Sequence, residues 1–321
     1  SPLDAATAFV TFDGHRTGDM KPYVFVTRDY GASWQSLATD QIEGYAWVVR
    51  QDLVAPDLLF LGTEFGLYIS IDGGKGWARF TGNLPKVAVH DIAIHPRDRD
   101  LILATHGRGI YIHDDITPLR QLSADVVAAD VTLLASPPAV MVTEGGVQNF
   151  TGDDEFLGFN PPDAVPITYY LKRRHMFGDL KLEIYDADGK LVSTVPGGKR
   201  KGLNRVYWPM RLPPPKLPAA TNLAPAFVGP RVLEGTYTIK LIKGDKTYES
   251  KVQLVPDPRS PHSAEDRSAS QRLALRLYGM LEDLTYAAET ASDLRNQATS
   301  RAGKLKAGDR TAKALTAFAD P

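Results

Sequence analysis

The sequence has no cysteine, no long apolar run and almost no excess of either charge. Without cysteine, disulfides, thiol nucleophiles and zinc–thiolate sites are excluded. No apolar stretch approaches the roughly 18 to 20 residues that a membrane span needs, and the first residues do not resemble a signal peptide. The 37 basic and 38 acidic side chains nearly balance, so neither nucleic acid nor a membrane surface is expected as a partner.

Two stretches share the pattern S/T-x-D-x-G-x-x-W: residues 27–34 (T-R-D-Y-G-A-S-W) and 70–77 (S-I-D-G-G-K-G-W). Each follows alternating aromatic and aliphatic residues, which is typical of a β-strand that enters a tight hairpin. The aspartate is expected to accept hydrogen bonds from N–H groups one and two residues further on. The glycine supplies a position with φ > 0, and the tryptophan folds back over the turn. Structural roles are therefore predicted for Asp29, Gly31, Trp34, Asp72, Gly74 and Trp77.

The aspartates set the period of a repeat. Asp29 and Asp72 lie 43 residues apart, and an eroded third copy places Asp115 another 43 residues on. A period of about 40 to 50 residues with several short strands per unit is typical of a β-propeller. About three blades are predicted in residues 1–122, with strands at 7–12, 23–27, 35–37, 47–50, 58–61, 67–70, 78–80, 89–94, 101–104, 110–113 and 119–122.

The first predicted blade has no room for an inner strand before residue 7. Propellers need about four or more blades to close, and an open ring leaves unpaired sheet edges that favour aggregation. We therefore expect this chain to be the C-terminal portion of a longer polypeptide. A companion segment or a second chain is expected to complete the propeller.

Three regions follow the propeller in a chain that is mainly β. Residues 123–165 are punctuated by Pro, Gly and Asp, which predicts an extended linker. Residues 166–257 hold short strands separated by turn signals and predict an immunoglobulin-like β-sandwich, with the Pro-rich stretch 213–230 as an exposed loop. Residues 258–321 predict a helical hairpin, because apolar residues fall at helical spacing from 273 to 294 and a second helix is expected over 309–318. Packing within the chain is the favoured interpretation of this apolar stripe, and a dimer seam is the alternative.

Several short motifs resemble one family. They are G-T-E-F-G-L-Y-I-S at 62–70, N-L-P at 83–85 and T-H-G-R-G-I-Y at 105–111 in the propeller, followed by N-P-P at 160–162, Y-Y-L-K at 169–172, G-L-N-R-V-Y-W at 202–208 and G-P-R-V-L at 229–233. The chain resembles the C-terminal part of bacterial sortilin-like Asp-box (BNR-repeat) propeller proteins with a C-terminal immunoglobulin-like domain, which are often labelled glycosyl hydrolases. The resemblance implies a longer, extracytoplasmic (periplasmic or secreted) protein, and it implies no settled activity.

Blade topology divides the polar residues between two ends of the propeller. The Asp-box turns lie at one end, and the turns between the second and third strands lie at the other, where propellers usually bind ligands. The candidate ligand-binding residues at this mouth are His15, Arg16, Glu64, His106 and Arg108, and the candidate catalytic residues are Asp13 and Glu64.

The favoured function is binding of a peptide, a glycan or a partner subunit through the propeller mouth. The alternative is a glycoside hydrolase, sialidase-like or xyloglucanase-like, whose second carboxylate comes from other blades; such an enzyme needs two carboxylates about 5 to 9 Å apart. Arg16 and Arg108 alone do not make the arginine cluster that a sialidase needs. No cofactor or metal is expected, because the adjacent His and acidic residues at 90–91 and 113–115 point to opposite faces of their strands.

Overall fold

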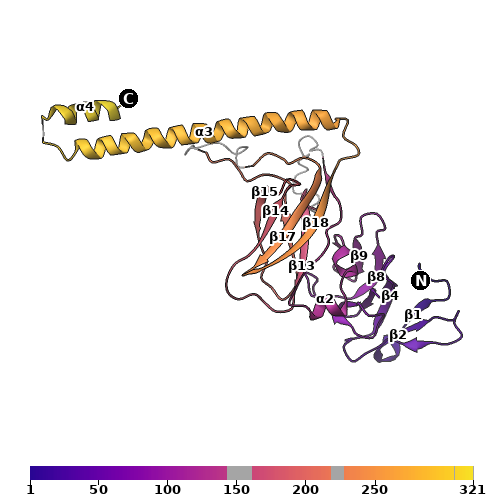
Figure 1. Ribbon diagram of the computed structural model, residues 1–321. Helices are drawn as coiled ribbons and strands as arrows, with labels where there is room; N and C mark the ends of the chain where they lie inside the picture. Colours follow the sequence, from indigo (N-terminus) through magenta and orange to yellow (C-terminus); the bar gives the residue numbers. More distant parts are fainter. Residues whose placement is uncertain (143–160, 218–227, 307, 321) are drawn as a thin grey trace.

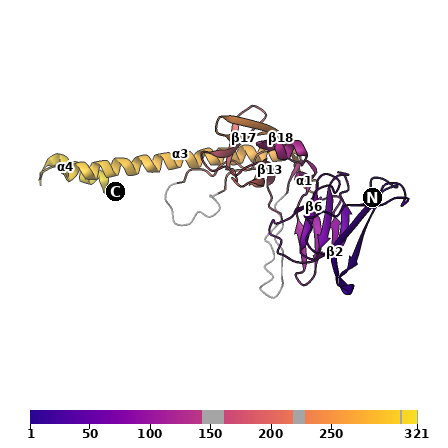
Figure 2. The same cartoon turned by 90° about the horizontal axis from the view of Figure 1, so that it is seen from below.

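The computed structural model describes residues 1–142, 161–217, 228–306 and 308–320. The chain is mainly β, with several small sheets at the N-terminus, a larger β-sandwich, and a long helix that extends away from the rest (Figures 1 and 2). No helix among the described residues is both long enough and apolar enough to cross a membrane.

The N-terminal region consists of three antiparallel sheets with three, four and three strands. The first contains β1 (Ala8–Gly14), β2 (Asp19–Thr27) and β3 (Gln35–Ser36), with the short 3-10 helix η1 (His15–Thr17) between β1 and β2. The second contains β4 (Ala46–Gln51), β5 (Leu59–Thr63), β6 (Gly66–Ser70) and β7 (Ala78–Arg79). The third contains β8 (Val89–Ile94), β9 (Leu101–Thr105) and β10 (Ile110–His113).

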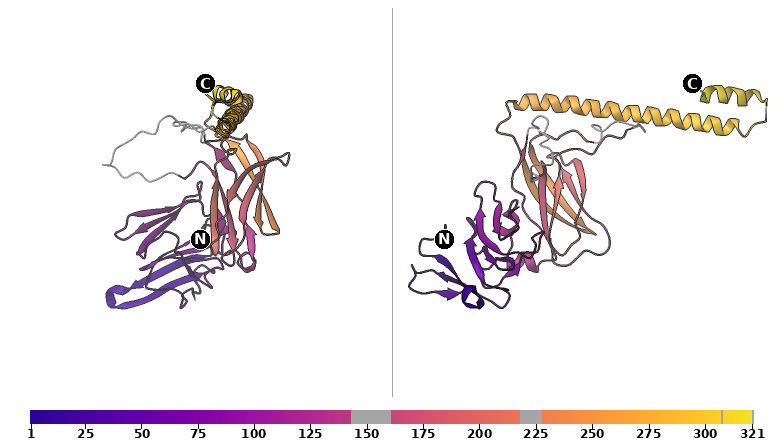
Figure 3. Two further views of the ribbon diagram at one scale, coloured as in Figure 1. Left: turned by 90° about the vertical axis from the view of Figure 1, so that its left-hand side faces the viewer. Right: turned by 180° about the vertical axis from the view of Figure 1, so that it is seen from behind.

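Two hydrophobic cores lie between these three sheets. Val24 and Val26 of β2 pack with Leu61 of β5 between the first and second sheets. Leu67 of β6 and Leu103 of β9 belong to the core between the second and third sheets. Small antiparallel sheets that stack face to face in this way are consistent with part of a β-propeller. Figure 3 shows the sheets side by side, next to the sandwich.

The predicted fourth strand of the third sheet, 119–122, is wrong. This segment belongs to the short helix α1 (Thr117–Arg120), which has Pro118 in its first turn and buries Leu119. Proline lacks the N–H that a strand ladder needs, and its fixed φ suits the first helical turn. Among the described residues, β10 is therefore an edge strand, whereas the corresponding strand β6 of the second sheet pairs with β7.

The segment predicted as an extended linker contributes to the sandwich. Its described part forms α2 (Ala124–Ala128), β11 (Val131–Leu133) and β12 (Ala139–Met141), and β11 and β12 each join a sandwich sheet. Strands of three residues are too short to show an alternating pattern in the sequence, which is why they were not predicted. The predicted linker residues 143–160 lie outside the described residues.

The sandwich has sheets of three and five strands that share one core. The first has the order β11-β13-β16 and the second β12-β18-β17-β14-β15. Their remaining strands are β13 (Val165–Leu171), β14 (Leu180–Tyr185), β15 (Leu191–Pro196), β16 (Gly202–Trp208), β17 (Gly235–Lys243) and β18 (Lys246–Pro256). Both sheets contribute to the core, for example Trp208 of β16 and Tyr237 of β17, whose rings lie 5.1 Å apart. Part of the predicted Pro-rich loop, 218–227, lies outside the described residues.

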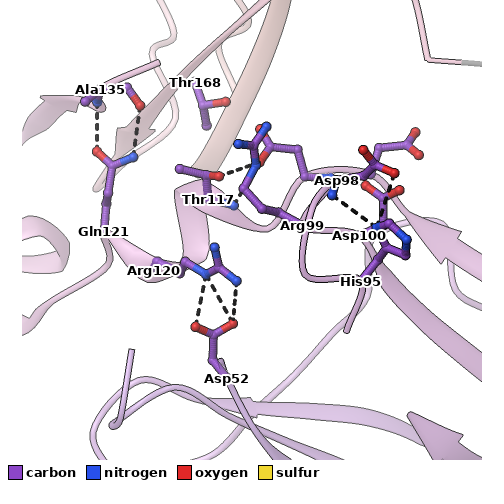
Figure 4. A network of polar contacts seen from close by, with 12 residues as sticks. Asp52, His95, Asp98, Arg99, Asp100, Thr117, Arg120, Gln121, Ala135 and Thr168 are labelled. Atoms are coloured by element: carbon purple, nitrogen blue, oxygen red, sulfur yellow. Dashed lines mark hydrogen bonds and ion pairs between the residues drawn. The ribbon is translucent and has the colours of Figure 1, made fainter. Parts of the chain in front are cut away.

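Polar contacts join α1 to the second small sheet, and they join the end of the N-terminal region to the sandwich. Arg120 of α1 forms a bidentate ion pair with the fully buried Asp52, with N–O distances of 3.0 to 3.1 Å (Figure 4). Gln121 exchanges two hydrogen bonds with the backbone of Ala135, at 2.8 and 2.9 Å. Arg205 of β16 donates to the carbonyl oxygens of residues 114 and 115, at 2.9 and 2.8 Å. The contacts of Gln121 and Arg205 fix the end of the N-terminal region on the sandwich.

The C-terminal region is a helical hairpin. Helix α3 (Ala264–Ala302) begins with a capping box, in which Ser263 and Asp266 each accept a backbone N–H of the other, a strong helix start. Its 39 residues give it a length of about 58 Å. Helix α4 (Arg310–Ala319) folds back antiparallel along the distal end of α3 (Figure 1).

Candidate functional site

The turn of each S/T-x-D-x-G-x-x-W motif is called an Asp-box turn here, for its sequence pattern alone. The first connects β2 to β3 through a network of local hydrogen bonds. Asp29 accepts from the Thr27 hydroxyl at 2.7 Å and from the Ser33 N–H at 2.9 Å. The Thr27 hydroxyl also accepts the Gly31 N–H at 2.9 Å, and Gly31 has φ +91°. The Ser33 hydroxyl and N–H and the Thr27 hydroxyl together lower the pKa of Asp29 to about 2. This carboxylate is thus fully engaged by its own turn.

The second Asp-box turn, between β6 and β7, repeats the same geometry. Asp72 accepts from the Ser70 hydroxyl at 2.8 Å and from the Gly76 N–H at 2.9 Å, and Gly74 again has φ +91°. The predicted N–H donors, one and two residues after the aspartate, are wrong. The donors are the hydroxyl two residues before it and the N–H four residues after it, because the two consecutive residues with φ > 0 turn the chain back over the carboxylate.

The two motif tryptophans differ in their surroundings. Trp77 is 4% exposed, and its indole N–H donates to the carbonyl of Leu37, after the last strand of the preceding sheet, at 2.9 Å. Trp34 is 47% exposed. Trp77 therefore packs against the preceding sheet rather than back over its own turn.

The mouth-side turns lie at the opposite ends of the sheets from the Asp-box turns, because consecutive strands are antiparallel. They are the β1–β2, β5–β6 and β9–β10 turns, and the segment before β4 joins them. The structure brings Asp13, His15 and Glu64 together around the buried ring of Tyr45, the last residue before β4. His106 lies in the β9–β10 turn and reaches the same region through ring contacts with its neighbours.

Asp13 and His15 form a pair on top of Tyr45. Nδ1 of His15 lies 2.6 Å from both carboxylate oxygens of Asp13, and the His15 backbone N–H donates to the same carboxylate at 2.9 Å. The imidazole stacks on the Tyr45 ring at 4.7 Å, with 11° between the planes. Burial raises the pKa of Asp13, but the N–H and imidazole of His15 outweigh it, so that this pKa is lowered.

Glu64 also lies close to Tyr45. Its backbone N–H donates to the Tyr45 carbonyl at 3.1 Å, and its side chain lies against Gly44. The pKa of Tyr45 is raised, first by burial and then by the negative charges of Glu64 and Asp13. The two candidate carboxylates thus both raise the pKa of the Tyr45 hydroxyl, which stays protonated and can donate a hydrogen bond.

A row of five rings crosses the mouth side of all three sheets. From the first sheet to the third its members are His15, Tyr45, Trp47, His90 and His106. Trp47 lies 5.5 Å from Tyr45 and 5.6 Å from His15, and its ring centroid is 4.2 Å from that of His90. His90 in turn stacks on His106 at 5.1 Å, with 23° between the planes. We call these five residues the ring row.

Trp47 and His90 were not predicted as site residues. Each is the extra residue of a β-bulge, in β4 and in β8 respectively, and they lie 43 residues apart in the repeat. A bulge re-aims one side chain without changing the strand pattern on either side. Their equal spacing was visible in the sequence, but the bulges that place them beside the mouth turns were not.

The electrostatics of the ring row keep its centre uncharged. The pKa of His90 is lowered, first by burial and then by the charge of His106. A neutral imidazole both donates and accepts a hydrogen bond. The row thus combines apolar ring faces at its centre with carboxylates at one end.

The other predicted mouth residues surround this row. Arg16 lies close enough for its charge to lower the pKa of Asp13, whereas Arg108 is exposed in the β9–β10 turn. Lys86 lies 3.6 Å from the Glu43 carboxylate and 4.3 Å from the centroid of the Phe65 ring, which links the second and third sheets. No group of three or more metal-ligating side chains occurs in the part of the chain that the structure describes.

A large cavity lies away from the mouth. It has a volume of about 980 Å³ and lies between the outer strand β7, the end of β10 and strand β16 of the sandwich. Phe80, His113 and Tyr207 line it. Pro118 and Leu119 of α1 also line it.

No protein-family model matches the chain, and no curated protein sequence is significantly similar to it. Among solved structures, the chain is similar to an ancestral GH74 enzyme, with 15% identity and a TM-score of 0.29 over 78% of this chain and 34% of that one. A GH74 xyloglucanase from Xanthomonas campestris has 12% identity and a TM-score of 0.25 over 78% and 37% of the two chains. The extracellular domain of a one-component system from B. thetaiotaomicron has 12% identity and a TM-score of 0.23 over 73% and 28%.

This chain thus spans 28 to 37% of the length of those three proteins. At such identities and scores the likeness extends to a propeller-like fold at most and says nothing of the site.

Proposed function

We propose that the chain is a ligand-binding part of a β-propeller that holds an extended glycan along the ring row. The observation that carries the proposal is the continuous path of five rings from His15 to His106 across three sheets. Aromatic faces bind the apolar faces of sugar rings, and a small number of polar groups fix the orientation. Asp13 and Glu64 supply acceptors for sugar hydroxyl groups, and the row has no cluster of cations that would select an acidic ligand.

A binding screen against neutral and acidic glycans and extended peptides tests this function. We expect neutral glycans to bind, and we expect Trp47→Ala to abolish this binding because it removes the centre of the ring row. Trp34→Ala is the matched control, since Trp34 is a half-exposed tryptophan outside the mouth. Selective binding of peptides, or equal binding by Trp47→Ala and wild type, would contradict the proposal.

A glycoside hydrolase is the second candidate function. It is favoured by the presence of two carboxylates, Asp13 and Glu64, close enough to the Tyr45 phenol for the charge of each to raise its pKa. In this case other blades complete the site. Hydrolysis of a bound sialidase or xyloglucanase substrate that is lost in both Asp13→Asn and Glu64→Gln would support the enzyme, whereas binding without turnover would exclude it for that glycan.

The proposal includes a companion segment or chain that completes the propeller. Support comes from apolar side chains on the two outermost sheet faces: Phe12 and Trp34 are exposed on the first sheet, and Ile110 and Ile112 on the third. Their counterparts in the second sheet are buried between neighbours. The sortilin-like resemblance further supports an extracytoplasmic location and an immunoglobulin-type sandwich.

A further inference from the structure

Helix α3 has an apolar stripe that is exposed to solvent. Its members are Leu273, Leu277, Met280 and Leu284, at spacings of four, three and four residues, with exposed fractions of 59, 52, 57 and 59%. This alternation is the spacing of the a and d positions of a coiled coil. We call these four residues the exposed stripe. Large apolar side chains in such a row mark an interaction surface rather than a solvated helix face.

The side of α3 that contacts the rest of the chain is a different one. Arg267 pairs with Glu234 at 2.7 Å, and the Thr285 hydroxyl donates to the Lys216 carbonyl at 2.7 Å. With 3.6 residues per turn, these contacts lie roughly 120° around the helix from the exposed stripe. The sandwich therefore leaves the stripe uncovered, and Figure 1 shows α3 extending well beyond it.

At the distal end of α3, another helix packs on the same line of positions. The same alternating spacing continues through Ala287, Ala291 and Leu294 to Ala298. Ala298 is only 5% exposed, and Ala319 of α4 is 7% exposed, where α4 packs antiparallel on α3. An antiparallel helix thus covers the end of this continuation at Ala298, whereas Ala287, Ala291 and Leu294 are exposed like the stripe.

We propose that the exposed stripe pairs with the same stripe of a second copy of this chain, as an antiparallel two-helix coiled coil. Charge selects the orientation. Arg276 and Asp283 flank the stripe on one side, seven residues apart. In the antiparallel pair, each Arg276 lies beside Asp283 of the other copy, whereas a parallel pair would place Arg276 beside Leu281 and Asp283 beside Ala288.

The mass of the chain in solution, measured by sedimentation over a concentration series, tests the pairing. We expect the mass to rise from 35.1 kDa towards twice that value. Leu277→Asp with Met280→Asp should keep the chain monomeric at every concentration. Tyr286→Asp is the matched control, since Tyr286 is 74% exposed on the same helix but outside the stripe, and it should dimerise like wild type. A wild-type chain that stays monomeric, or a stripe variant that still dimerises, overturns the proposal.

Two further comparisons test the orientation. Arg276→Asp should weaken the dimer at least severalfold, and adding Asp283→Arg to the same chain should restore it. Because the chain has no cysteine, an introduced cysteine reports contacts directly. Chains with Leu273→Cys should form a disulfide with chains carrying Leu284→Cys, but neither should do so with itself. Disulfides between two Leu273→Cys chains and between two Leu284→Cys chains would contradict the antiparallel pair. A dimer that Asp283→Arg does not restore would contradict it as well. Circular dichroism checks that α3 remains helical in every variant.

Discussion

The first and second sheets have the same turn but different surroundings. Their Asp-box networks match at an offset of 43, including φ +91° at Gly31 and Gly74, except that the hydroxyl of Ser33 has no counterpart at Gly76. Yet Trp77 is buried against the first sheet, while Trp34 is half exposed. The turn is therefore a local structure that the motif specifies by itself. Burial of the tryptophan depends on a neighbouring blade, which the first sheet lacks on its outer side in this chain.

The third sheet extends this comparison. Tyr111 is the counterpart of Tyr68, and both face the preceding sheet. The position that corresponds to Trp77 is Arg120, which pairs with the buried Asp52 of the second sheet. One repeat thus uses an indole to contact its predecessor, and the next uses an ion pair.

The largest expected effect concerns the two tryptophans. Trp77→Ala should lower the free energy of unfolding by about 3 to 5 kcal/mol, because it leaves a cavity between two sheets and removes a buried hydrogen bond. Trp34→Ala should lower it by only about 0.5 kcal/mol. Denaturation by urea measures both. Similar losses for the two variants would show that the first sheet is covered after all.

The ion pair that replaces the tryptophan should be nearly as important. Arg120→Met should lower the free energy of unfolding by about 3 kcal/mol, because it leaves the carboxylate of Asp52 buried without its counter-charge. Arg97→Met is the matched control: Arg97 also pairs with an aspartate, but its side chain is 82% exposed, and such surface pairs contribute at most about 1 kcal/mol. An equal effect of both substitutions in urea denaturation would contradict the role of the buried pair.

The turn network of the first sheet should appear in the acid dependence of stability. The pKa of Asp29 is lowered from 3.8 to about 2, so its stabilising contribution is present above pH 3.8 and is lost as the pH falls through about 2. The stability difference between wild type and Asp29→Asn should therefore be constant above about pH 4 and shrink below it. A difference that persists unchanged to pH 2 would contradict the hydrogen-bond network.

The smallest effect concerns the ring row. The folded chain holds the pKa of His90 below 6.5, by burial first and by His106 second. The unfolded chain therefore takes up a proton first, so that stability falls as the pH drops from 6.5 to the lower folded-state pKa and then levels off. In His106→Ala the pKa of His90, followed by NMR, should rise part of the way back. If the pKa of His90 is the same in His106→Ala and wild type, the two imidazoles do not interact.

Much of the propeller region was predictable because its signals are local. The repeat of Asp29 and Asp72 defined the period, and alternating residues located strands such as β8 and β10. The predictions failed where a contact between residues far apart in the sequence determines the secondary structure. The three-residue strands β11 and β12 exist because they pair with β13 and β18. A strand was predicted over 119–122 from the repeat. The segment instead begins in a helix, with Pro118 in the first turn and Arg120 paired with the buried Asp52.

The site shows the same division. Asp13, His15, Glu64 and His106 were predicted from the topology of the turns, and the structure brings them to one side of the sheets. Trp47 and His90 were missed, because a bulge shows only in the register between two strands. The contact of His15 with Tyr45 joins residues 30 positions apart in the sequence, and no local pattern predicts it.

Hydrogen exchange on β2 and β6 tests the central claim most directly, namely that the outer face of the first sheet is a blade interface left open in this chain. The two strands are matched, since each is paired on both sides within its sheet. The amides of Tyr23 to Val26 should exchange faster than those of Leu67 to Ile69, because only the second sheet is covered on both faces. Equal protection of the two strands would contradict the claim.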